Sequence, residues 1–155
     1  MAQEPRDIKA AYPLPSYNYR VTIGSEVLSF AEVSGLSLQY EPVTYKHGLS
    51  FALGHKIIPG MRQPVQLTLK RGVVQSRDFL RNWIDSVYND AFASGTKRDI
   101  VIDLCDEAGA PVVRWTVHSA MPTRLDAPSL DANSNDVAIE TMELAAQNLQ
   151  VDYSP

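Results

Sequence analysis

Three histidines and one cysteine are the side chains of this 155-residue sequence best suited to binding a metal or acting as a nucleophile: His47, His55, His118 and Cys105. His47 and His55 lie eight positions apart, a separation that fits no metal-ligand spacing on a helix or strand. Cys105 has acidic residues close on both sides, and their charge disfavours the thiolate that a nucleophile requires. The pattern therefore predicts structural side chains and no metal site.

The carboxylates Asp103, Asp106 and Glu107 are close enough in sequence to suggest an acid–base pair. Asp106 and Glu107, however, begin the predicted turn 106–109, and turns select aspartate because its side chain bonds the nearby backbone. The sequence also lacks a nucleophile elbow, a phosphate-binding loop and a dinucleotide fingerprint. We therefore expect a protein that is not an enzyme and needs no cofactor.

The composition is typical of a globular domain, with 45% hydrophobic and 21% charged residues. A chain of this length buries roughly 70% of the surface that its unfolded form exposes, so its core needs neither metals nor disulfides. The net charge of −4 and the absence of a Lys/Arg run argue against nucleic-acid binding. Residues 1–155 are expected to form a single domain.

The sequence carries no recognisable targeting segment. Residues Met1–Lys9 are polar and lack the apolar centre of a signal peptide. No run of 18 apolar residues is present, so no membrane-spanning helix is predicted. We expect synthesis in the cytoplasm and transport by a route that this sequence does not encode.

Alternating apolar and polar residues predict a chain rich in half-buried strands. Residues 1–13 should form a loose N-terminal arm, whose end is stiffened by prolines. In the first strand, the alternation turns Tyr17 and Tyr19 toward a core or a lumen. The predicted strands are 17–23, 27–33, 36–44, 65–69, 99–105 and 111–120.

Residues 45–63 have poor periodicity and contain Gly48, Gly54, Pro59 and Gly60. They are interpreted as a long loop with a short strand at residues 56–58. Loops of this length inside a compact domain are usually functional or disordered. This one is too apolar to stay in water, so it either covers its own domain or packs on another subunit.

Residues 76–93 are the one clear helix, with Ser76 as the expected N-cap and Gly95 as the stop. An apolar stripe along it predicts packing against a core. The stripe consists of Phe79, Leu80, Trp83, Ile84, Val87 and Tyr88.

The C-terminal segment 136–149 is ambiguous, because its Ala, Glu, Met and Leu content favours helix while a strand is also possible. Residues 122–136 form a second long connection. Successive strands with a single helix predict a mainly β fold, an antiparallel sandwich or barrel with one packed helix.

An ordered set of short phrases resembles the phage tail tube protein family of contractile tails, which includes extracellular contractile injection systems and R-type pyocins. The resemblance covers about residues 12–150 and extends in fold to the hemolysin-coregulated protein of type VI secretion. The phrases are Tyr12–Pro15, Tyr17–Val21, Phe30–Leu36, Tyr45–Gly48, Ile58–Gly60, Leu67–Gly72, Arg114–Trp115, Ala120–Pro122 and Asp136–Leu144.

This resemblance implies six subunits in a ring, rings stacked into a tube around a lumen, and a contractile sheath outside. Sheath contraction would drive the tube through a target envelope. Expected partners are further copies of the chain, the sheath protein, baseplate and tube-terminating proteins, and possible lumenal cargo. The assembled particle would resemble a phage tail and could be released outside the cell. The family also implies that residues 136–149 form a strand.

Two surfaces are expected to carry this assembly. The long loop would contact another subunit or ring through His47, Gly48, Leu49, Phe51, Ile57, Gly60 and Met61. The polar face of the helix would face the sheath through Arg77, Arg81, Asp85 and Asn89.

Two other functions remain open on the sequence alone. Close members of the family serve as tube-initiating adaptors near the baseplate. A monomeric ligand-binding β-sandwich would instead expose an aromatic platform, for which Tyr17, Tyr19 and Tyr40 are the candidates.

Overall fold

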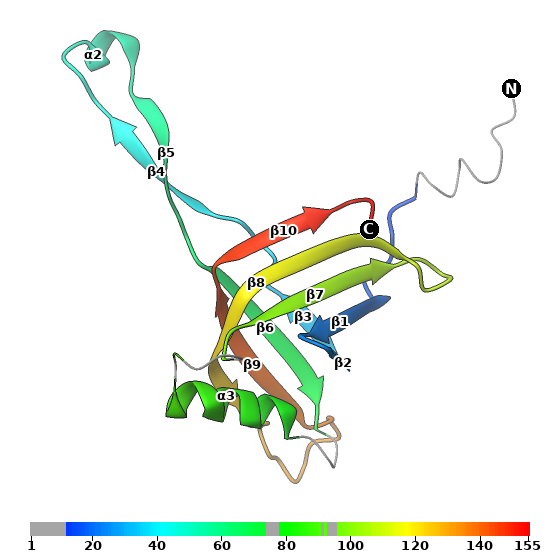
Figure 1. Cartoon of the computed structure of the whole chain (residues 1–155). Helices are drawn as coiled ribbons and strands as arrows, with labels where there is room; N and C mark the ends of the chain where they lie inside the picture. Colours follow the sequence, from blue (N-terminus) through cyan, green and yellow to red (C-terminus); the bar gives the residue numbers. More distant parts are fainter. Residues whose placement is uncertain (1–11, 74–77, 91, 93–95) are drawn as a thin grey trace, which may run out of the picture.

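The computed structural model describes residues 12–73, 78–90, 92 and 96–155 (Figure 1). Eight antiparallel strands form one sheet in the order β2-β1-β7-β8-β9-β6-β3, with β10 also paired to β8. The strands are β1 (Tyr19–Ile23), β2 (Glu26–Leu28), β3 (Glu32–Ser34), β6 (Val65–Gly72), β7 (Arg98–Cys105), β8 (Pro111–Asp126), β9 (Ile139–Ala146) and β10 (Asn148–Asp152).

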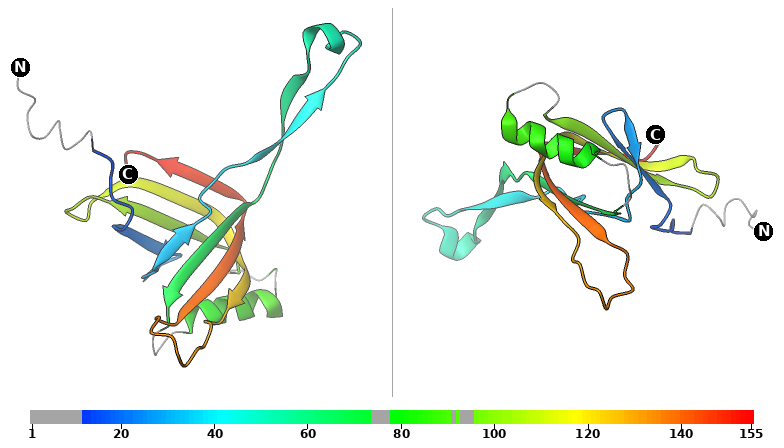
Figure 2. Two further views of the ribbon diagram at one scale, coloured as in Figure 1. Left: turned by 180° about the vertical axis from the view of Figure 1, so that it is seen from behind. Right: turned by 90° about the horizontal axis from the view of Figure 1, so that it is seen from below.

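The strand β8 divides this sheet into two halves that face each other as a sandwich (Figures 1 and 2). Its first part pairs with β7 and β10, and its last residues pair with β9. The strand changes partner at Ser119, which has a positive φ of 55° and donates its N–H to Asp99 Oδ1 at 2.9 Å. Among the described strands the end strands β2 and β3 do not pair with each other, so the sheet stays open.

The core lies between the two halves and follows the alternation of the sequence. The strand β6 shows this most clearly, because Val65, Leu67 and Leu69 are buried while Gln66 is exposed. The helix α3 (Phe79–Asn89) adds Leu80 and Trp83 to the same cluster. The Trp83 indole N–H donates to the Thr96 carbonyl at 2.8 Å, which satisfies its one polar group in the interior.

The mainly β, antiparallel architecture with one packed helix is confirmed, and the sandwich form is the one observed. The C-terminal segment is confirmed as strand: β9 pairs with β6 along its whole length, and this pairing overrides the local preference for helix. The expected strand 27–33 is two short strands, and the expected strand 36–44 begins only at residue 40.

The prediction for the helix was too long, and one of its apolar positions was wrong. The helix begins after Asp78 at the N-cap position, while Ser76 and Gly95 lie outside the described residues. Tyr88 is 91% exposed rather than in the core. The cause is geometric, since five residues turn a helix by about 140°, and Tyr88 therefore points well away from Trp83.

The long loop 45–63 is also different from the prediction. It belongs to a two-stranded hairpin of β4 (Tyr40–Tyr45) and β5 (Lys56–Arg62), separate from the main sheet. A short helix, α2 (Ser50–Leu53), caps the hairpin. The predicted strands 36–44 and 56–58 cover parts of β4 and β5, but poor alternation hid their pairing, because both of their faces carry apolar residues.

The outer face of the first half-sheet holds a buried carboxylate between two arginines. Asp103 accepts hydrogen bonds from Arg114 at 2.7 Å and from Arg20 at 3.3 Å. Burial alone would raise the pKa of Asp103, but the bonds from Arg114 and then Arg20 outweigh it, so the pKa is lowered. The group tying β1, β7 and β8 together is therefore an ionised aspartate.

We expect Asp103→Asn to lower the free energy of unfolding by about 2 kcal/mol at pH 7, because charge-assisted bonds to both arginines are lost. A carboxyl whose pKa falls on folding stabilises the protein above its unfolded pKa of about 4, and that contribution is lost as the pH falls through the folded pKa. The difference between wild type and variant should therefore shrink between pH 7 and pH 3. Urea unfolding at both pH values measures it, with exposed Glu26→Gln as the control. A difference that is constant with pH contradicts this account.

Candidate assembly interface

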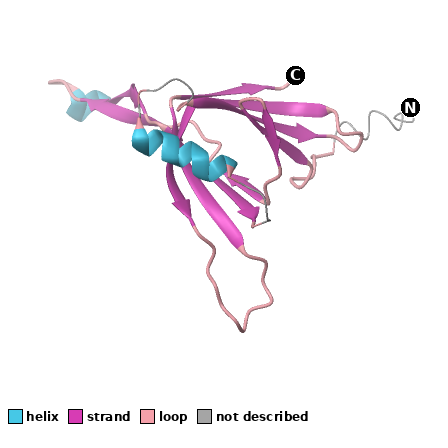
Figure 3. Ribbon diagram, turned by 60° about the horizontal axis from the view of Figure 1, so that its bottom comes forward, coloured by secondary structure: helices cyan, strands magenta, loops and turns pink. Residues whose placement is uncertain are grey.

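The β4–β5 hairpin projects from the sandwich as a separate arm with α2 at its tip (Figures 1 and 3). Its base is held by Arg62, whose guanidinium donates to the Tyr40 hydroxyl at 2.8 Å and lies 5.4 Å from the centre of that ring. The same guanidinium donates to Asn148 Oδ1 at the start of β10. Arg62 therefore links both strands of the hairpin to the sandwich.

Gly60 lies within β5, where its backbone closely approaches that of β4. A Cβ at this position would lie 2.0 Å from the Glu41 carbonyl oxygen, so a side chain would push the two strands apart. The register of β4 and β5 shifts at the same level, between Tyr40 and Pro42. Glycine here permits the close backbone approach at an irregular pairing. Gly48 lies in the turn before α2 and meets no atom that a Cβ would touch.

Both faces of the hairpin are apolar and open to solvent. Val43 pairs with Ile58 on one face, and Thr44 pairs with Ile57 on the other. Ile57 is 75% exposed and Met61 84% exposed. A lone two-stranded hairpin is only marginally stable in water, and its exposed apolar residues need a partner surface.

The tip continues this apolar surface. Leu49 and Leu53 are both exposed at either end of α2, and the side chain of Phe51 lies outside the described residues. The Leu49 N–H donates to His47 Nδ1 at 3.1 Å, while the His47 ring lies 6.0 Å from that of Tyr45. The histidine therefore helps to order the turn that leads into the tip. The predicted interface residues that the structure describes thus all lie on the β4–β5 hairpin, which brings them together.

The side chains first considered for catalysis are dispersed or already paired. His47 and His55 lie on the hairpin, whereas His118 lies on β8 and contacts Gln150 at 2.9 Å. Cys105 is buried and its sulfur lies 3.7 Å from the Asp103 carbonyl oxygen. In the described part of the chain no group of three His, Cys, Asp or Glu side chains is placed to hold a metal. The described helices include none that is long and apolar enough to cross a membrane.

The outer surface of α3 combines charge with exposed aromatic rings. Arg81 and Asp85 form an ion pair at 3.1 Å, one turn apart, and both side chains are largely exposed. Asn89 is exposed at the end of the helix, whereas Arg77 lies outside the described residues. Tyr88 and Phe92 are almost fully exposed beside this polar group. Sequence reasoning placed Tyr88 in the core and therefore missed this mixed surface.

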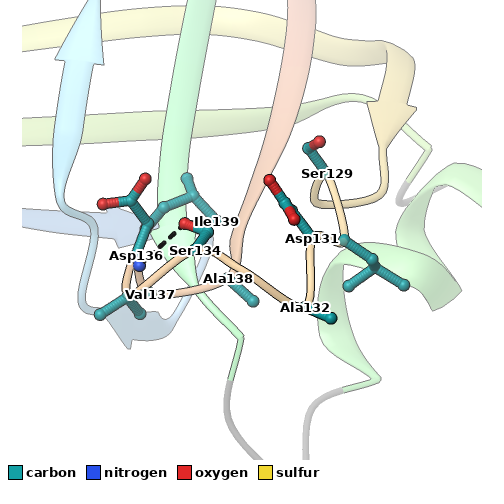
Figure 4. Close-up of a pocket in the computed structure, with 9 residues that line it drawn as sticks. Ser129, Asp131, Ala132, Ser134, Asp136, Val137, Ala138 and Ile139 are labelled. Atoms are coloured by element: carbon teal, nitrogen blue, oxygen red, sulfur yellow. Dashed lines mark hydrogen bonds between the residues drawn. The ribbon is translucent and has the colours of Figure 1, made fainter.

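The loop between β8 and β9 encloses an open hollow of about 970 Å³ at the end of the molecule that carries α3 (Figures 1 and 4). Figure 4 shows Asp131 and Asp136 on the two arms of this loop. Leu130 and Val137 are exposed beside it. The sequence indicated only a second long connection here. The signal available was that residues 126–138 contain three aspartates and no basic residue.

The chain matches known proteins over nearly its whole length. The model of the family T4-like virus tail tube protein gp19 matches residues 15–150. A chain of the sheath–tube complex of the extracellular contractile injection system PVC is 32% identical, with 98% of this chain and 99% of that chain covered and a TM-score of 0.85. Among curated protein sequences none matches significantly.

Two further structures are similar at the level of sequence and fold. A chain of the PVC sheath/tube terminator is 34% identical over 91% of this chain and 97% of that chain, with a TM-score of 0.82. A chain of the six-fold symmetrised anti-feeding prophage baseplate is 26% identical over 92% and 97%, with a TM-score of 0.78. Hcp1 from Flavobacterium johnsoniae, at 13% identity and a TM-score of 0.57 over 89% and 97%, shares the fold. The chain is therefore a member of the T4-like virus tail tube protein family.

Proposed function

We propose that this protein is the repeating subunit of the inner tube of a contractile, phage-tail-like injection system. Six copies form a ring, and the rings stack around a lumen. Contraction of an outer sheath propels this tube through a target envelope. The similarity to the PVC sheath–tube complex over 98% of the chain supports this role.

The observation that carries the proposal is the projecting hairpin with apolar residues on both faces. Val43 and Ile58 on one face and Ile57 on the other stay exposed in the isolated chain. A projecting arm that docks on a different surface of the next copy makes a heterologous contact, which generates rings or filaments. We therefore propose that the interface residues expected from the sequence form contacts between subunits or rings. They are His47, Gly48, Leu49, Phe51, Ile57, Gly60 and Met61.

The open sheet favours ring formation for a second reason. The strands β2, β3 and β10 end the pairing within the described chain and leave backbone groups available at the sheet edges. Such edges promote uncontrolled association unless they are covered or paired. Closure of six sandwiches into a ring would pair or cover them.

The proposed partners follow from the role. The sheath would contact the outer face of α3 through Arg77, Arg81 and Asp85, and tube-terminating and baseplate proteins would meet the two ends of the tube. The protein would be made in the cytoplasm and released only as part of the particle, with cargo carried in the lumen. We further propose that it catalyses no reaction, since Asp103 and Cys105 are both engaged in the interior.

A tube-initiating adaptor at the baseplate is the second candidate. It is favoured by the similarity to a chain of the anti-feeding prophage baseplate. That chain is 26% identical, against 32% for the chain of the sheath–tube complex. The higher identity and the coverage of both chains favour the main tube.

The monomeric ligand-binding sandwich has little support. Tyr17 is exposed, contrary to the expected inward orientation, because it precedes β1 and does not share the alternation of that strand. Tyr19 donates its hydroxyl to the Phe30 carbonyl at 2.7 Å, and Tyr40 is engaged by Arg62. The three rings are thus divided among different roles and offer no common platform.

Negative-stain electron microscopy of the purified protein across a concentration series, with light scattering, tests the proposal directly. We expect six-fold rings at low concentration and hollow tubes at high concentration. The tube role is contradicted if the protein stays monomeric at every concentration and also after baseplate from its own injection system is added. Glycan and small-molecule screening would then test the ligand-binding alternative.

Each apolar face of the hairpin should be required for assembly. We expect Ile57→Asp and Ile58→Asp separately to raise the protein concentration at which tubes form by about tenfold or more. Burying an isoleucine contributes roughly 1.5–3 kcal/mol, and 1.4 kcal/mol is tenfold in affinity. Light scattering measures the threshold, and circular dichroism and Tm check that the sandwich is intact. Tyr88→Asp, also at an exposed apolar position, is the matched control and should assemble normally.

The charged face of α3 should affect the sheath and not the tube. Arg81→Glu is expected to weaken co-sedimentation of the sheath protein with preformed tubes while free tubes stay intact. The double variant Arg81→Glu/Asp85→Arg restores an i,i+4 ion pair but keeps the charge pattern inverted. It should bind sheath as poorly as the single variant. Normal binding by the double variant would mean that the single change acts through helix stability.

A further inference from the structure

The tip of the hairpin and the loop between β8 and β9 carry opposite charge. Residues 44–58 contain Lys46, Lys56 and two histidines, and no acidic residue. Residues 126–138 contain Asp126, Asp131 and Asp136, and no basic residue. This separation is not a consequence of the overall composition, which mixes both signs along the rest of the chain.

These two segments lie at opposite ends of the molecule. Figure 1 shows α2 at one end and the loop between β8 and β9 at the other, below α3, and the view from behind in Figure 2 agrees. The hairpin therefore cannot reach the loop of its own chain. A contact between the two requires a second copy.

The charges at both ends have no ion-pair partner within the described chain, although the Asp131 carboxylate accepts the Asn133 backbone N–H at 2.9 Å. Lys46 and Lys56 are exposed, as are Asp131 and Asp136. None of the four belongs to an ion pair among the described residues, whereas nearby Asp126 is paired with Arg124 at 2.9 Å. Their fields therefore extend into solvent, where they can act on another molecule.

Both segments also expose apolar side chains. The tip presents Leu49 and Leu53 on a narrow projection, and the loop surrounds an open hollow flanked by Leu130 and Val137. Leu130 is 86% exposed and Val137 72% exposed, so both can take part in an apolar contact with another molecule. Figure 4 shows the hollow open between the two arms of the loop.

We propose that the hairpin tip of one subunit docks into the hollow of the loop 127–138 on a second copy of this chain, in the next ring of the tube. The leucines of the tip meet Leu130 and Val137, and Lys46 and Lys56 meet Asp131 and Asp136. The contact is heterologous and does not close, so it repeats along the axis and gives the tube a direction. This inference rests on the proposed tube function and names the surface that receives the hairpin.

The proposed contact makes stacking sensitive to salt. Oppositely charged ends steer approaching rings into register, and their attraction falls as ionic strength rises, because the screening length is about 10 Å at 0.1 M salt and about 3 Å at 1 M. The apolar part of the contact is not screened. Tubes should therefore grow more slowly in high salt, while tubes already formed persist.

Charge exchange tests the pairing. Lys46→Glu/Lys56→Glu and Asp131→Lys/Asp136→Lys should each raise the threshold concentration for tubes at least tenfold, since like charges brought together cost more than 1.4 kcal/mol. Six-fold rings should still form. The protein carrying all four changes, or an equimolar mixture of the two variants, should recover tube formation. Arg81→Glu, which alters a charge outside this contact, is the control.

Disulfide trapping gives the position of the contact independently. Leu53→Cys and Leu130→Cys in one chain should link subunits of neighbouring rings on oxidation, because Cys105 is buried and does not compete. Links that form in isolated rings before stacking would put the hairpin on a neighbour within the ring and overturn the proposal. The proposal would also be overturned if either charge-reversal double variant formed tubes normally. The same holds if combining the two reversals did not restore tube formation. Wild-type protein that forms neither rings nor tubes would contradict the tube function itself.

Discussion

A two-stranded ribbon with apolar residues on both faces cannot bury either face by itself, and this constraint governs the rest of the molecule. All the remaining strands belong to the sandwich and share its core. In contrast, β4 and β5 lie outside it, with Ile57 and Ile58 in solvent. The protein is therefore incomplete as a monomer in a physical sense. The proposed function assigns its missing contacts to other copies, and such an arm would then need a receiving surface elsewhere on the chain.

The β4–β5 hairpin can dock in a defined way only if its direction is fixed, and several contacts with the sandwich fix it. Arg62 joins Tyr40 to Asn148, which connects the base of the hairpin to β10 and through it to β8. The strand β8 continues through the bend at Ser119 into the second half-sheet, so both halves share one backbone. The hairpin is thus attached to the strand that organises the whole sandwich.

Much of this fold follows from local sequence patterns. The strict alternation of Val65, Leu67 and Leu69 identified β6, and the spacing of Leu80 and Trp83 identified α3, because in both elements one face is buried and the other is not. Where this asymmetry is missing, the pattern carries no signal. The hairpin has two apolar faces, and the sequence therefore predicted only parts of its strands, residues 36–44 and 56–58, within what was otherwise interpreted as a loop. The strand β9 was recognised through family resemblance, since its pairing with β6 outweighs its composition.

The proposed assembly surfaces differ in how far the sequence points to them. Apolar residues such as Leu49 and Met61 in a glycine-containing segment predict a contact, and the structure shows these side chains exposed. The loop 127–138 gave no such indication, because a receptor surface needs few apolar residues and depends on where the fold places it. Only the structure puts the loop between β8 and β9, with its two unpaired aspartates, at the end of the molecule opposite the hairpin tip. Complementarity between the ends is a property of the fold and cannot be read from either segment alone.

Formation of the hairpin and assembly of the tube are physically coupled. An isolated two-stranded ribbon gains too little from its own backbone bonds to offset the entropy of ordering it, so it is held mainly by its base and by what it docks on. The first subunits to associate must order this arm with few contacts in return, while subunits added to a preformed end dock on a complete receiving surface. Growth from an existing end is therefore favoured over spontaneous initiation, because the ordering cost is met at once by a full set of contacts. On the proposed function, rings of such a subunit would therefore stack most readily where a template presents the proposed receiving surface.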